Sequence, residues 1–100
     1  MVKNPASIQF TSPDHALLTD YQIDFVTAAG AVIQTLTVPV AQVTVLPTGE
    51  ILIALNVQPV AFGTYTFVVR SVAGPDISEN SEPSEPWQRV PGAPSQIVVK

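Results

Sequence analysis

Ten prolines are scattered through this chain of 100 residues, and β-branched residues fill the gaps between them. Proline lacks a backbone donor and disrupts the interior of a helix, so a helix is hard to place anywhere. Valine, isoleucine and threonine favour extended backbone instead. The scatter of prolines therefore predicts a chain built from short strands.

Polar and apolar side chains alternate with a period of two residues, as on strands with one buried face. In the clearest example, Tyr21–Phe25, the odd-numbered residues are apolar and the even-numbered ones are polar. Turn signals such as Pro47-Thr48-Gly49 recur at intervals of about 8 to 12 residues. This pattern predicts an all-β fold, an antiparallel sandwich of two sheets. Further strands are expected at 7–11, 31–38, 41–46, 50–57 and 64–72, with an edge strand or irregular segment at 78–89.

Length and composition fit one folded domain, because 100 residues have room for a single core and 46% of them are apolar. Strand parity predicts that Phe10, Tyr21, Ile23, Phe25, Tyr65, Phe67 and Val69 fill this core. The longest apolar run, Ile51–Leu55, is far shorter than the roughly 18 to 20 residues of a membrane span, so no membrane segment is expected.

Localisation depends on how the chain begins. Residues Met1–Pro5 contain no long apolar run of a secretory signal. We therefore expect a cytoplasmic or virion protein if Met1 is the natural start, and an extracellular or cell-surface protein if the domain was excised.

Several kinds of chemistry lack the residues that they need. Without cysteine, the chain can form no disulfide, no thiolate metal site and no cysteine nucleophile. The net charge is -4, and the four cations form no basic stripe, so nucleic acid is not expected as a partner.

Two groups of titratable residues are candidates for a reactive site. His15, the only histidine, lies near Ser12, but close neighbours in a turn seldom point at one another, so we expect a solvated loop histidine. Four acids are spaced unlike a calcium loop and have prolines among them: Asp76, Glu79, Glu82 and Glu85. No catalytic residue, cofactor or metal site is predicted, and the chain is not expected to be an enzyme.

Three segments carry a resemblance to a known family. Ile8–Pro13 and Thr19–Phe25 have the pattern of an aromatic second strand, a proline loop and an aromatic third strand. Gly63–Gly74 has the pattern of a sixth strand, with Tyr65 at the tyrosine-corner position. Over residues 6–90 the chain resembles a fibronectin type III domain of the bacterial or phage type, which implies an immunoglobulin-like sandwich.

The chain departs from the family at its two ends, because the first-strand pattern is displaced from the N-terminus to the C-terminus. Phe10 stands where the family usually has tryptophan, and Met1–Ala6 is too short to supply the family's entry and first strand. That pattern appears instead in Val90–Lys100, which resembles the linker and first strand of a following module. We therefore divide the chain into a sandwich at 1–90 and a linker with an extra C-terminal strand at 91–100.

The C-terminal residues 91–100 have two alternative places. They would lie beside their own segment 78–89 as a hairpin, or fray, or they would enter the empty first-strand slot of a neighbouring copy stacked head to tail. After residue 90 the chain runs in the direction that an antiparallel strand needs in the first-strand slot of the neighbouring copy, and in the wrong direction for the slot of its own copy. A self-contained hairpin avoids an association cost of about 4 to 15 kcal/mol, so the arrangement within one copy, as a hairpin or a frayed tail, is favoured on that ground.

The sequence predicts a non-catalytic structural or protein-interaction module. The resemblance implies a part of a surface, virion or multidomain assembly, with another protein or a second copy as partner. The alternative is a carbohydrate-binding accessory module of a secreted enzyme, which needs exposed coplanar aromatic rings. Tryptophan is common in binding hot spots, and an outer apolar stripe can mark an interface. The candidate contact residues are Trp87, Val68, Arg70, Val72, Ile97 and Val99.

Overall fold

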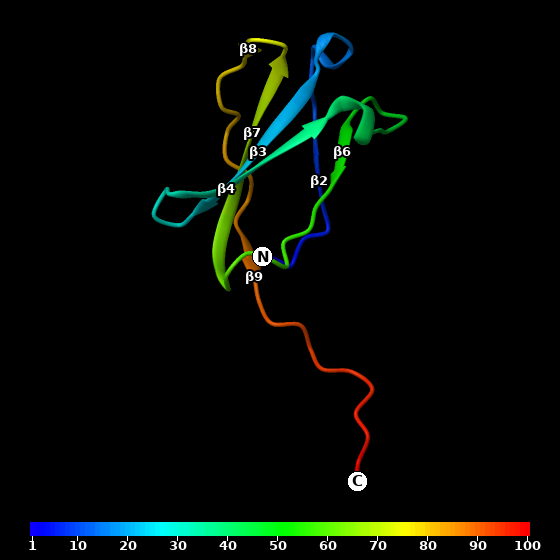
Figure 1. Ribbon diagram of the computed structural model, residues 1–100, viewed down its shortest axis with the longest axis vertical. Coiled ribbons are helices and arrows are strands. Elements are labelled where there is room, and N and C mark those ends of the chain that lie inside the picture. The colour runs from blue at the N-terminus through cyan, green and yellow to red at the C-terminus, as the bar shows by residue number, and fades with distance from the viewer.

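The structure, a computed structural model, describes all 100 residues and contains two β-sheets (Figure 1). The only helical turns are the short 3-10 helices η1 (His15–Leu17) and η2 (Val40–Gln42), and no helix is long and apolar enough to cross a membrane. The main sheet consists of β1 (Val2–Lys3), β3 (Asp20–Thr27), β4 (Val32–Pro39), β7 (Gly63–Ala73), β8 (Asp76–Ile77) and β9 (Trp87–Arg89). The small sheet consists of β2 (Ser7–Phe10), β5 (Thr44–Val45) and β6 (Ile51–Ala54). The prediction of an all-β, two-sheet fold is confirmed.

The main sheet is centred on β3, which pairs antiparallel with β4 on one side and with β7 on the other. Both β8 and β9 pair with the far edge of β7, and β1 lies beside β9. The β1–β9 pair is parallel, with Val2 opposite Trp87. The predicted antiparallel arrangement is therefore wrong at this pair, because β1 runs alongside β9 before the chain turns into the small sheet.

The core lies between the two sheets and follows the period-two alternation. Tyr21, Ile23 and Phe25 of β3 are fully buried, and they meet Ile51 and Ile53 of β6. Of the other predicted core residues, Tyr65 and Phe67 are buried, whereas Phe10 and Val69 are half-buried at the margin of the core.

Several strands are shorter than the sequence predicts. The segment 41–46 contributes only β5, because η2 follows Pro39 and Pro47 lies two residues after the strand ends at Val45. The predicted turn at Pro47-Thr48-Gly49 is confirmed: Gly49 adopts a φ of 87°, and its amide donates to Leu46 O at 2.8 Å. Proline thus sets the ends of strands as well as excluding helices.

Tyr65 forms the backbone contact expected of a tyrosine corner. Its hydroxyl donates to the carbonyl oxygen of Ala61 at 2.7 Å, four residues upstream. The ring itself is buried, at 6% exposure, beside Trp87. This bond ties the loop that precedes β7 to the strand that it enters.

Candidate strand-binding groove

The outer edge of β2 has no partner strand. In the small sheet, β2 pairs with β6 alone, with Ile8 opposite Ile53. Leu55 N donates to Ala6 O at 2.8 Å, so the peptide groups of Ala6 face β6, and those of every second residue after it, Ile8 and Phe10, face β6 as well. Because the bonding direction alternates along a strand, the N–H and C=O groups of Ser7, Gln9 and Thr11 point away from β6. An additional strand could bind there.

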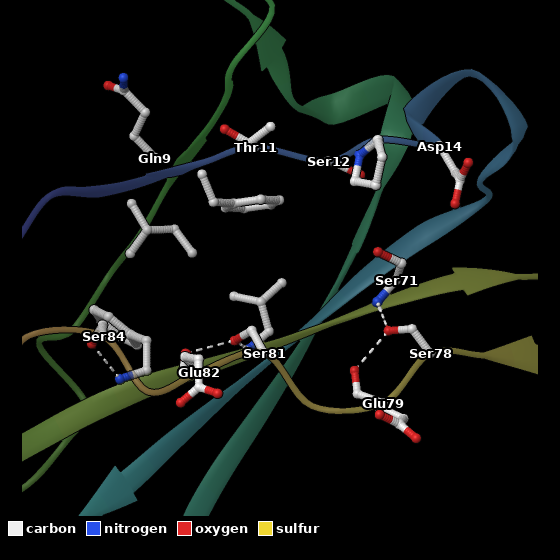
Figure 2. A pocket seen from close by; sticks show the side chains of 15 residues that line it. Gln9, Thr11, Ser12, Asp14, Ser71, Ser78, Glu79, Ser81, Glu82 and Ser84 are labelled. Carbon is white, nitrogen blue, oxygen red and sulfur yellow. Dashed lines mark hydrogen bonds between the residues drawn. The ribbon is translucent and has the colours of Figure 1, made fainter.

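A groove with a volume of about 520 Å³ lies along this edge, and we call it the β2 groove (Figure 2). One wall is β2 and the turn that follows it, residues 8–14, and the opposite wall is formed by residues 78–84. The apolar lining consists of Ile8, Phe10, Phe67 and Val69. The rim carries three carboxylates and no cation, the carboxylates being those of Asp14, Glu79 and Glu82.

The wall opposite β2 is built from three Ser-Glu-x triplets, and we call Ser78, Ser81 and Ser84 the serine wall. The amide of each serine donates to a carbonyl of β7, on Ser71, Val69 and Phe67 in turn, at 2.9 Å. Each serine hydroxyl accepts a bond from the amide of the same β7 residue, at 2.8 to 2.9 Å.

The hydroxyls of the serine wall also donate to the next carbonyl along the chain, at 2.8 to 2.9 Å. The edge of β7 is therefore satisfied by a segment that is not a regular strand. This arrangement tolerates Pro83 and Pro86, since no proline amide has to join the ladder. Figure 2 shows the carboxylates of Glu79 and Glu82 directed away from β2, which leaves the groove between them and β2 open.

An ion pair stabilises the opposite face of the main sheet. Arg70 donates to both carboxylate oxygens of Asp24, at 2.6 and 2.9 Å, and Thr35 donates a third bond at 2.7 Å. Asp24 is only 5% exposed. The hydrogen bonds from the Arg70 guanidinium hold the pKa of the Asp24 carboxyl below its usual range, against the opposing effect of burial.

Acid is expected to destabilise the protein through Asp24. A carboxyl with a lowered pKa in the folded state contributes stability above its unfolded pKa of about 4, and this stability is lost as the pH falls through the folded value. Urea denaturation between about pH 5 and pH 2 should therefore show a steeper loss of unfolding free energy in the wild type than in Asp24→Asn. The control, Glu85→Gln, removes an exposed charge and should keep the wild-type slope. Equal slopes for Asp24→Asn and wild type would contradict this role.

The candidate contact residues from the sequence do not come together, and none of them lines the groove. Trp87 is 2% exposed and packs in the core. Val68 and Val72 are also buried, so they form no exposed stripe, and Arg70 between them is bound to Asp24. Ile97 and Val99 alone are freely exposed, at 80% and 93%.

His15 and the four acidic residues named as candidates lie in different environments. His15 is half-buried rather than solvated: its Nδ1 lies 2.7 Å from the hydroxyl of Tyr21, and the two rings stack at 5.9 Å. Asp76, Glu79, Glu82 and Glu85 form no cluster of three that could hold a metal ion.

No motif in the sequence marks the residues of the β2 groove as a site. Strand parity predicts Phe10 as a core residue, and the prolines predict an edge strand or irregular segment at 78–89. The available signal was the displacement of the family's first-strand pattern to Val90–Lys100. In the structure Val2–Lys3 pairs with β9 in the main sheet, so it does not cover the edge of β2. Comparisons of the chain with protein-family models, curated proteins and solved structures find no match.

Proposed function

We propose that the chain is a non-catalytic structural or protein-interaction module that binds an extended segment in the β2 groove. The observation that carries this proposal is the unpaired edge of β2 beside an open apolar lining. In β-strand addition, main-chain hydrogen bonds supply affinity and pockets for alternate side chains supply selectivity. The free peptide groups of Ser7, Gln9 and Thr11 lie beside the apolar lining and would supply the hydrogen bonds, and the lining would supply the pockets.

The proposal includes a fibronectin type III-like identity for the sandwich. Two features support it: the Tyr65 corner, and the division into a β4-β3-β7 sheet and a β2-β6 sheet. In such a sandwich a first strand would lie beside β2, where the groove now lies. The groove is thus the place of a missing structural strand, which explains its length and its apolar lining.

The carbohydrate-binding alternative gains no support from the aromatic side chains. Phe62 is the one aromatic residue among the exposed large apolar side chains, and Arg89 covers one face of its ring at 5.0 Å. A sugar platform needs several exposed rings in one plane. A segment of protein fits the available surface better.

A selection from a library of short random peptides tests the proposal. We expect the selected peptides to alternate apolar and polar residues, and to bind the wild type at least about tenfold more tightly than Gln9→Pro. Proline at position 9 removes an amide that faces the groove, and it is tolerated because that amide does not pair with β6. A circular dichroism spectrum of Gln9→Pro that matches the wild type would show that the variant folds.

The matched control places proline on the edge of the other sheet. Thr37 of β4 is exposed, and the bond from Val40 N to Thr19 O sets the parity of this pair, so its amide also points away from the partner strand. Thr37→Pro should leave peptide binding unchanged. Peptides that bind Gln9→Pro as tightly as wild type, or a selection that yields no binders, would overturn the proposed function.

A further inference from the structure

The C-terminal residues 91–100 extend away from both sheets and form no strand (Figure 1). No backbone hydrogen bond joins them to the sandwich, and every one of them is exposed. The segment nevertheless carries three consecutive apolar side chains, those of Ile97, Val98 and Val99, which are 71% to 93% exposed. An apolar run of this kind gains stability when a neighbouring surface covers it.

The direction of this segment decides which groove it can enter as an antiparallel strand. β2 runs from the pole where the C-terminal segment leaves toward the pole that carries η1, and the segment continues in the opposite direction (Figure 1). In a second copy stacked below in the same orientation, the segment would meet the η1 pole first. It would then run antiparallel to β2 of that copy. In its own groove it would have to reverse and run parallel to β2.

We propose that the β2 groove of one copy binds residues 94–100 of a second copy, so that copies join head to tail. This inference rests on the proposed function of the groove and names its occupant. The contact is heterologous, because the donor segment and the acceptor groove are different surfaces. Repetition of the contact therefore builds open chains of copies rather than a closed dimer.

The chemistry of the segment fits the groove. Seven extended residues span about 23 Å, which is long enough to cover the four residues of β2 and reach the turn that follows it. Side chains alternate along a strand, so Ile97 and Val99 share one face and Val98 and Lys100 share the other. We place the face with Ile97 and Val99 against the apolar lining, because the other face carries the charge of Lys100. The segment carries one cation, Lys100, and the rim of the groove carries three carboxylates and no cation. No proline follows Pro94, so the amides of residues 95–100 can join the ladder.

Sedimentation of the full chain over about 10 µM to about 1 mM tests the inference. The wild-type mass should rise progressively from the 10.6 kDa of one copy, without a stop at the dimer. Two variants should stay monomeric: Ile97→Asp combined with Val99→Asp, which disables the donor, and Gln9→Pro, which disables the acceptor. Val98→Asp is the matched control, because its side chain faces outward, and it should associate like the wild type.

A mixture of the two disabled variants gives the sharpest readout. The donor-disabled chain keeps its groove and the acceptor-disabled chain keeps its segment, so the mixture should form one-to-one dimers and nothing larger. A monomeric wild type at the highest concentration, or association that survives in the donor-disabled variant, would overturn the inference. If the wild type is monomeric but selected peptides still bind the groove, the proposed function stands and only the occupant is wrong.

Discussion

Replacing Trp87 with alanine is expected to lower the free energy of unfolding by about 3 to 5 kcal/mol, a large part of the roughly 5 to 15 kcal/mol of a typical domain. The indole is 2% exposed, and its ring lies 4.8 Å from Phe67, 5.1 Å from Tyr65 and 5.9 Å from Phe25. Its removal would leave a cavity among three rings. Urea denaturation followed by circular dichroism measures the change, because the variant has lost the only tryptophan.

Trp87→Phe is the matched control for this prediction. Phenylalanine keeps much of the ring packing and removes the indole N–H, which is buried without a hydrogen-bond partner. Loss of that unsatisfied donor offsets part of the lost volume, so we expect a cost of about 1 kcal/mol. A cost below about 1 kcal/mol for Trp87→Ala would mean that the indole is not part of the core.

Replacing all three residues of the serine wall with alanine is expected to destabilise the protein by about 2 to 3 kcal/mol. Each substitution removes a hydroxyl that accepts a bond from a β7 amide and leaves that amide without its partner. Ser84 should contribute most, because its bond to the Phe67 amide is partly buried. Chemical denaturation of the triple variant and of each single variant measures these contributions.

The control for the serine wall replaces the neighbouring glutamates, Glu79, Glu82 and Glu85, with glutamine. These side chains are exposed, and their substitution should change the unfolding free energy by no more than about 0.5 kcal/mol. If the alanine variant is as stable as the glutamine variant, the serine hydroxyls do not stabilise the edge of β7.

The period-two alternation predicted the all-β fold and the inner face of β3, because a strand buried on one face needs apolar residues at every second position. The family resemblance implied a tyrosine corner at Tyr65, and the hydroxyl of this residue does bond to upstream backbone. Parity identifies which side chains share a face of a strand. It does not identify whether that face is covered.

The burial of Val68 and Val72 could not be predicted from this alternation. They lie on the outer face of β7, yet both are buried, on either side of Arg70 and beside β3 in the middle of the main sheet. The Asp24–Arg70 ion pair lies on the same face of the sheet. Such burial depends on strand order, which pairs residues more than forty positions apart in the chain and leaves no local signal.

The β2 groove was missed for a similar reason. Its walls come from segments about 70 residues apart, and its opening depends on the absence of a strand rather than on any motif. The sequence did indicate that the first-strand pattern was displaced to residues 91–100. Within one copy, the hairpin with residues 78–89 is absent and residues 91–100 extend as an unpaired tail, the other arrangement expected there, because β9 ends at this pole and the chain continues away from it.

Amide hydrogen exchange along β2 tests the central claim most directly. In the full chain at a concentration where it is monomeric, the amides of Ile8 and Phe10, which face β6, should be protected. Those of Ser7, Gln9 and Thr11 should exchange as fast as in an unfolded peptide, because nothing in the groove accepts their bonds. Protection of Gln9 equal to that of Ile8 in the monomer would show that the edge of β2 is already paired, and would contradict the account.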